Sequence, residues 1–272
     1  MDKKNMGVAA VATIAIVIVL AASFVMLGND NGDVDDTETI KFLIQDDKGV
    51  YFWVEGEGDT AIAAFENAIG QDVYKDAAAF VPSTDKDTGA ANGIQSLYGL
   101  EMKGDGTTWF WWGQFIWDGS AWQSSSKYMN NYGFEESEYI ALVYSDGSGV
   151  PKVTPADVKI WDQSQDGTVF TIESSTGLTF QVNGEGTTVY DAFKDATVTY
   201  SIPYEPSKDA AGVEYGINSM FGLEMYQEGT TWYYWSQYVW VDGAWGYANT
   251  GMNGLASAEN PVFKIIYEGT TF

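Results

Sequence analysis

The sequence predicts an α+β protein of two tandem domains, each a sheet with one short helix, following an N-terminal transmembrane helix. Three observations predict this class. The chain begins with a long uncharged apolar run, its remainder contains an internal repeat, and each copy of the repeat reads as a hairpin, a short helix and further strands. A chain of 272 residues has room for two domains of ordinary size.

The apolar run extends from Met6 to Leu27, 22 residues without a charge. That length suffices for a bilayer core, which needs about 20 apolar residues. A secretory signal is the alternative, because Ala21, Ala22 and Ser23 offer small residues for a peptidase, but its apolar region usually spans only about 7 to 15 residues. Residues 1–27 are therefore predicted as a membrane anchor or a signal peptide, and residues 28–38 as an acidic linker.

The charges that flank the apolar run predict its orientation. Lys3 and Lys4 hold the N-terminus in the cytoplasm by the positive-inside rule. We therefore expect a single-pass protein of the cell membrane whose C-terminal part is extracellular.

Composition excludes several chemistries. The chain has no His and no Cys, so a Ser-His-Asp triad, a thiol nucleophile, the usual zinc sites and disulfides are all excluded. Its formal net charge of -25 argues against a nucleic-acid partner, since affinity for phosphates comes from basic side chains. Carboxylate pairs that recur in both copies, Glu101/Glu224 and Glu57/Glu185, are the remaining acid-base candidates. We expect a binding protein rather than an enzyme, because duplicated modules add avidity.

The internal repeat is clearest where residues 93–102 (GIQSLYGLEM) reappear as residues 216–225 (GINSMFGLEM), an offset of 123. Upstream of these segments the offset becomes 128. The repeat predicts domain 1 over residues 39–146, a linker over 147–156 and domain 2 over 157–270.

Within each copy the patterns predict a hairpin, a helix, an aromatic strand and a closing strand. In the first copy these occupy residues 40–44 with 50–54, 60–69, 109–117 and 139–144. In the second copy they occupy residues 170–172 with 178–182, 188–196, 232–240 and 262–267. Thr188 and Asp191 have the spacing of a capping box at the second helix.

The aromatic strands, WFWWGQFIW and WYYWSQYVW, have two apolar faces. Alternation places Trp109, Trp111, Phe115 and Trp117 on one face and Phe110, Trp112, Gln114 and Ile116 on the other. A sheet covered by one helix needs one apolar face, so the second should contact the other copy, a partner or a ligand. Burial of both faces by long loops and domain packing is the alternative. Rigid Trp and Tyr rings suit stacking on sugars or flat ring systems.

The order Ile217-x-Ser219-Met220-x-Gly222-Leu223, then Tyr234-Trp235, then Asp242-Gly243, then a final strand, is similar to a known family. It resembles the C-terminal β-grasp-like domain of transcobalamin and intrinsic factor, which also occurs in prokaryotic surface proteins. The first copy matches with Ile94-x-Ser96-Leu97-x-Gly99-Leu100, Trp111-Trp112 and Asp118-Gly119. The resemblance implies two tandem β-grasp-like domains.

In the vitamin carriers this domain acts as a lid over cobalamin held against a separate helical domain. This chain has no candidate for that helical domain, so corrinoid binding would require the two copies to face each other, or a second protein. The lack of His excludes an imidazole ligand to cobalt. The resemblance and the aromatic strands give these candidate ligand-binding residues: Ile94, Ser96, Leu97, Gly99, Trp111, Trp112, Gln114, Trp117, Ile217, Ser219, Met220, Gly222, Tyr234, Trp235, Gln237 and Trp240.

One segment fits the spacing of an EF-hand calcium loop, with Asp162, Ser164, Asp166 and Glu173 as candidate ligands. Its flanks alternate like strands, whereas the motif requires helices, so a plain Asp-Gly turn without metal is the favoured interpretation. No cofactor is required by the sequence.

Two functions remain open from the sequence. The first is capture of a small ligand, with a corrinoid as the family-based candidate. The second is an adhesion or scaffold module that binds protein or glycan at the cell surface. An enclosed cleft between the copies would favour the first, and an exposed flat aromatic patch would favour the second.

Overall fold

The computed structural model describes residues 39–71, 78–104, 106–161, 166–241 and 243–271. Every described residue belongs to the compact unit Thr37–Phe272. The predicted anchor and acidic linker, residues 1–38, lie outside the described residues. Within the described ranges, no helix is both long enough and apolar enough to cross a membrane.

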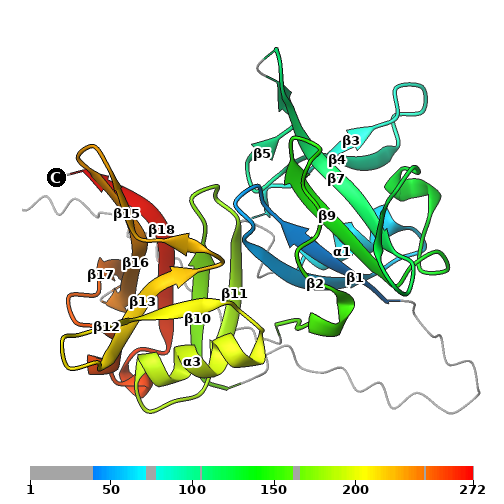
Figure 1. Ribbon diagram of the computed structural model, residues 1–272. Coiled ribbons are helices and arrows are strands. Elements are labelled where there is room, and N and C mark those ends of the chain that lie inside the picture. The colour runs from blue at the N-terminus through cyan, green and yellow to red at the C-terminus, as the bar shows by residue number, and fades with distance from the viewer. Residues whose placement is uncertain (1–38, 72–77, 105, 162–165, 242, 272) are drawn as a thin grey trace, which may run out of the picture. The chain divides into compact units, whose positions relative to one another are not determined.

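The first copy builds a six-stranded sheet with the order β2-β1-β9-β7-β6, and β8 pairs with β7 (Figure 1). The two central strands β1 and β9 are parallel and the other pairs are antiparallel. The strands are β1 (Thr39–Gln45), β2 (Tyr51–Glu57), β6 (Lys103–Gly104), β7 (Trp109–Trp117), β8 (Trp122–Ser124) and β9 (Tyr139–Ser145).

The second copy repeats this sheet with the order β11-β10-β18-β16-β15, and β17 pairs with β16. The register repeats as well: Leu43 lies opposite Ala141 in copy one, and Thr171 lies opposite Lys264 in copy two. The strands are β10 (Thr168–Glu173), β11 (Thr179–Gly184), β15 (Tyr226–Glu228), β16 (Thr231–Val241), β17 (Ala244–Tyr247) and β18 (Val262–Thr271).

One α-helix of each copy packs on one face of its sheet, α1 (Ala61–Ile69) against β2 and α3 (Val189–Thr199) against β11. Thr60 and Thr188 cap the two helices, and each side chain accepts a hydrogen bond from the backbone N–H three residues on, at 3.3 and 3.1 Å. Phe65 of α1 and Phe193 of α3 are fully buried. The predicted cap at Thr188 is confirmed.

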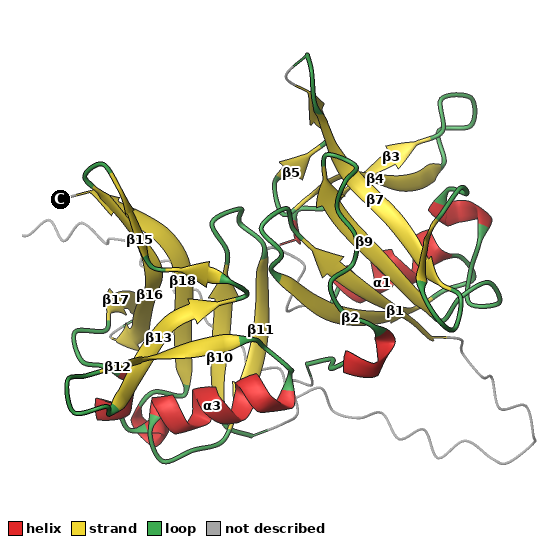
Figure 2. Cartoon of the chain, in the orientation of Figure 1, coloured by secondary structure: helices red, strands yellow, loops and turns green. Residues whose placement is uncertain are grey.

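The prediction of an α+β class with a single sheet in each domain is wrong. Strands make up about 48% of the structure against 15% helix, so the protein is mainly β, as Figure 2 shows. Each copy has a second, three-stranded sheet, β3 (Val81–Thr84), β4 (Ala91–Leu97) and β5 (Leu100–Glu101), or β12 (Tyr204–Lys208), β13 (Glu214–Met220) and β14 (Leu223–Glu224). The physical reason is that the Gly- and Asn-containing segments after each helix pair as hairpins, which satisfies their backbone groups.

Short 3₁₀ turns complete the described elements. They are η1 (Met129–Asn131), η2 (Pro155–Asp157), η3 (Met252–Gly254) and η4 (Ser257–Glu259).

Equivalent positions of the two copies contact each other inside the unit Thr37–Phe272. Phe52 stacks on its repeat equivalent Phe180, with ring centroids 5.2 Å apart and planes 9° from parallel. The buried carboxylate of Asp46 accepts a 2.9 Å hydrogen bond from the hydroxyl of its equivalent Ser174. The apolar core therefore continues from one copy into the other.

Candidate binding surface

The outer face of each six-stranded sheet, defined as the face away from its helix, can be compared position by position. In copy one a row across the sheet from β2 to β8 consists of Trp53, Leu43, Ala141, Phe115 and Ser124. Trp53, Leu43 and Ala141 are almost completely buried. Because α1 packs on the opposite face of this sheet, another part of the chain must exclude water from the outer face.

The segment after β9 covers the outer face of copy one. Val153, Val158 and Ile160 pack on the cluster that contains Trp53. The Trp122 indole N–H donates to the carbonyl of Val153 at 2.7 Å. The Gln45 side chain makes two more hydrogen bonds to the backbone of this segment, at 3.1 and 2.9 Å. The predicted linker is therefore a packed part of copy one.

In copy two the same row consists of Gln181, Thr171, Lys264, Tyr238 and Tyr247. The polar side chains pair among themselves. Gln181 donates to the Thr171 hydroxyl at 3.1 Å, and the Lys264 ammonium lies 2.8 Å from a carboxylate oxygen of its neighbour Glu173. This row can face water without a covering segment.

Three tyrosines gather around a carboxylate on this face. The Tyr238 hydroxyl donates to Glu268 Oε1 at 2.5 Å. In the strand register Tyr238 lies opposite Lys264, whereas Glu268 lies opposite Tyr234, so the Tyr238 ring leans along the strand toward Tyr234. Tyr247 meets the Tyr238 ring edge to face at 5.7 Å. We call Tyr234, Tyr238, Tyr247 and Glu268 the tyrosine cluster.

The surroundings of two tyrosines in the cluster raise their pKa values. Burial, followed by the hydrogen bond to Glu268, raises the pKa of Tyr238 to about 12. Burial also raises the pKa of Tyr247, with the neighbouring Tyr234 and the charge of Glu268 as further causes. Both hydroxyls therefore stay protonated at neutral pH and remain hydrogen-bond donors.

A pair of tryptophans extends the cluster. Trp240 and Trp245 lie edge to face at 5.1 Å and are 41% and 38% exposed. Their equivalents in copy one, Trp117 and Trp122, keep the same geometry at 5.3 Å but are only partly accessible. We call Tyr234, Tyr238, Trp240, Trp245 and Tyr247 the aromatic face of copy two.

Several of the predicted ligand-binding residues lie in the core instead. The indoles of Trp112 and Trp235 are buried, and each donates to a carbonyl in the adjoining hairpin at 3.0 Å. Also buried are Ile94, Ser96, Leu97, Ile217, Ser219 and Met220. Their placement favours a structural role, because a buried Trp with a satisfied N–H anchors the hairpin it contacts.

The predicted Gly99 and Gly222 lie at exposed turns, where φ values of 74° and 77° favour glycine. Gln114 and Gln237 are half-buried and direct their amides toward Gly93 and Gly216 on the helix side of the sheet. They are therefore separated from the outer face.

The remaining predicted residues, Trp111, Trp117, Tyr234 and Trp240, lie on the outer faces. Trp240 and Tyr234 join the aromatic face of copy two. The prediction missed the rest of that face and its carboxylate, namely Tyr238, Trp245, Tyr247 and Glu268. A comparison of the copies at the 123-residue offset would have identified three of these four, since Tyr238, Tyr247 and Glu268 stand where copy one has Phe115, Ser124 and Ser145.

Half of the alternative calcium loop, Asp162 and Ser164, lies outside the described residues. Asp166 is exposed, and Glu173 belongs to β10, where it pairs with Lys264. In the part of the chain that is described, no group of three acidic side chains is placed to hold a metal ion.

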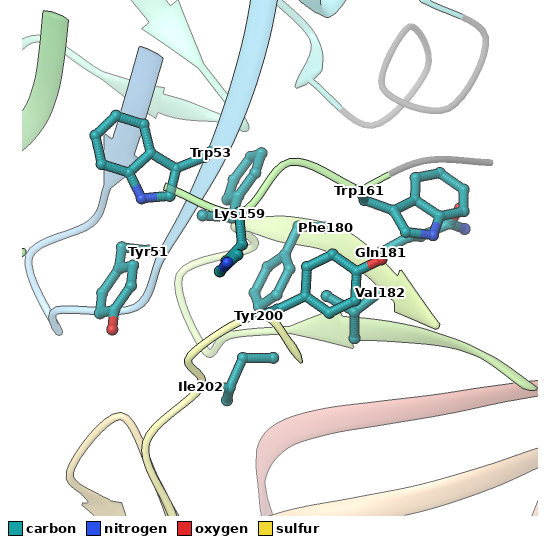
Figure 3. A pocket seen from close by; sticks show the side chains of 10 residues that line it. Tyr51, Trp53, Lys159, Trp161, Phe180, Gln181, Val182, Tyr200 and Ile202 are labelled. Atoms are coloured by element: carbon teal, nitrogen blue, oxygen red, sulfur yellow. The ribbon is translucent and has the colours of Figure 1, made fainter. Parts of the chain in front are cut away.

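A cavity lies where the two copies meet, lined by Tyr51 and Trp53 on one side and Phe180 and Tyr200 on the other (Figure 3). Its volume is about 20 Å³. That is room for about one water molecule, whereas ligand pockets measure about 300–1,000 Å³. The aromatic face of copy two is therefore the stronger candidate site.

Comparison with known proteins does not identify a ligand for this face. No protein-family model matches the chain, and no curated protein matches it. A function has to be inferred from the chemistry of the aromatic face itself.

Proposed function

We propose that this chain is a cell-surface glycan-binding protein and that the aromatic face of copy two is its binding surface. One observation carries the proposal: copy two keeps Trp240 and Trp245 exposed on its outer face, whereas their equivalents in copy one, Trp117 and Trp122, are only partly accessible beside the segment that covers Trp53. Location at the cell surface rests on the predicted anchor over residues 1–27.

The chemistry of the aromatic face suits a sugar. A pyranose ring has an apolar C–H face, which stacks on Trp and Tyr rings, and a hydroxyl edge, which needs donors and acceptors. Trp240 and Trp245 supply the rings, while the Tyr238 hydroxyl, Lys264 and Glu268 supply polar partners beside them. An apolar peptide would suit this face less well, because it would desolvate the Lys264–Glu173 ion pair and the Glu268 carboxylate without offering them a polar partner.

Small-ligand capture is the other function that the sequence predicts. The cavity shared by the copies is too small for a corrinoid, so a corrinoid would need a surface completed by a second protein. The resemblance to transcobalamin and intrinsic factor stays a prediction, and the geometry favours the glycan.

Calorimetry on the full-length chain tests the proposal, with cellohexaose and the N-acetylglucosamine hexamer as probes and cyanocobalamin as the competing ligand. We expect saturable binding of at least one sugar probe. Trp240→Ala should weaken it about tenfold or more, because stacking on the ring is lost. The matched variant Trp117→Ala changes the equivalent residue of copy one and should leave the affinity unchanged.

Two results would overturn the proposal. In the first, neither sugar probe binds while cyanocobalamin binds saturably, which would favour small-ligand capture. The other is an equal loss of sugar affinity in both Trp variants, which would mean that the aromatic face of copy two is not the site.

A further inference from the structure

The geometry of the tyrosine cluster points to selectivity within the proposed glycan class: we propose that Glu268 binds the ammonium group of an amino sugar. The inference rests on the proposed function and deepens it. It commits the aromatic face to a polysaccharide that contains glucosamine-type residues with free amino groups.

Glu268 is a half-buried carboxylate without a cation. Among the ion pairs of the described residues, Lys264 is bound by Glu173, and none includes Glu268. The sequence has no Arg that could serve instead. The hydrogen bond from Tyr238 uses Oε1, and a carboxylate has about four acceptor sites, so capacity for an ammonium remains.

The surrounding rings also favour a cation. Tyrosine rings attract ammonium groups through their negative faces, and a neighbouring carboxylate adds a charged acceptor. Tyr238 and Tyr247 lie edge to face with ring centroids 5.7 Å apart, and the Tyr238 hydroxyl is hydrogen-bonded to Glu268. An ammonium at Glu268 would thus contact the carboxylate and at least one tyrosine oxygen.

Copy one provides an internal contrast. At the positions of Tyr238, Tyr247 and Glu268 it has Phe115, Ser124 and Ser145, so neither the carboxylate nor the phenol groups are present. The outer face of copy two therefore has a carboxylate where the outer face of copy one has a serine. The net charge of -25 increases the local concentration of any cationic polymer around the chain.

The test compares the glucosamine hexamer with the N-acetylglucosamine hexamer and cellohexaose by calorimetry on the full-length chain, at a pH where the amines are protonated. We expect the glucosamine hexamer to bind about tenfold more tightly than the other two, and the difference to shrink with salt. Glu268→Gln keeps an acceptor for Tyr238 and should abolish the preference. Glu259→Gln, in the exposed turn η4, removes the same charge elsewhere and should preserve it.

The outcomes separate the two proposals. Equal binding of all three hexamers would overturn amino-sugar selectivity and leave glycan binding intact, whereas no binding of any hexamer would overturn the proposed function. If the preference survives in Glu268→Gln, the effect comes from overall charge, and the role of Glu268 is overturned. If hexalysine binds as tightly as the glucosamine hexamer, the face binds a cationic peptide equally well, and the role of Glu268 in sugar selectivity is likewise overturned.

Discussion

The outer faces of copies one and two have the same strand order, the same register and the same Trp pair, but only copy two leaves its pair exposed. In copy one, Trp53, Leu43 and Ala141 form an apolar surface on which residues 150–160 pack. In copy two, Gln181, Thr171 and Lys264 take those positions. The covered face therefore has apolar side chains at these three positions, and the open face has polar ones.

The largest expected effect is on the covered face. Trp53→Ala should lower the free energy of unfolding by about 3–5 kcal/mol, because it removes a 3% exposed ring and leaves a cavity under the covering segment. The matched variant Gln181→Ala, at the equivalent half-exposed position, should cost no more than about 0.5 kcal/mol. Urea denaturation measures both, and similar costs at the two positions would contradict the contrast between the faces.

A smaller effect is expected where the covering segment is held by a hydrogen bond. Trp122→Phe removes the indole donor to the Val153 carbonyl and should cost about 1–3 kcal/mol, since a partly buried carbonyl loses its partner. Amide hydrogen exchange should become faster in residues 150–160. Trp245→Phe, the equivalent change on the open face, serves as the control and should alter neither quantity.

The smallest expected effect appears only in alkali and belongs to the open face. Because the folded-state pKa of Tyr238 is about 12, above the ordinary value of about 10, its contribution to stability is complete below about pH 10 and is lost as the pH rises through 12. The tyrosinate absorbance of the wild type minus that of Tyr238→Phe isolates this group among 17 tyrosines. A difference transition near pH 10 would disprove the hydrogen bond to Glu268.

The local elements could be predicted from the sequence because their signals are local. Thr60 and Thr188 mark the helix starts, and the aromatic runs mark β7 and β16. Gly56 of β2 and Gly184 of β11 occur where a Cβ atom would lie 2.1 Å from a helix carbonyl oxygen, so these glycines permit the close approach of helix and strand. The repeat offset also equates the two copies correctly across the sheet.

The class and the site could not be predicted in the same way. The three-stranded sheets form from Gly-containing segments with weak periodicity, and whether such segments pair depends on partners distant in sequence. Residues 150–160 pack beside Trp122, and no such segment packs beside its equivalent Trp245 among the described residues. The sequences of the aromatic strands do not specify this difference in exposure.

What the sequence determined by itself, then, is the duplication, the order of hairpin, helix and aromatic strand in each copy, and a surplus of aromatic side chains for one helix to cover. The tertiary structure alone decided which of these surplus aromatic side chains are buried. The physical reason is that burial depends on what packs on a face, and among the described residues it is the apolar outer face of copy one that a following segment covers.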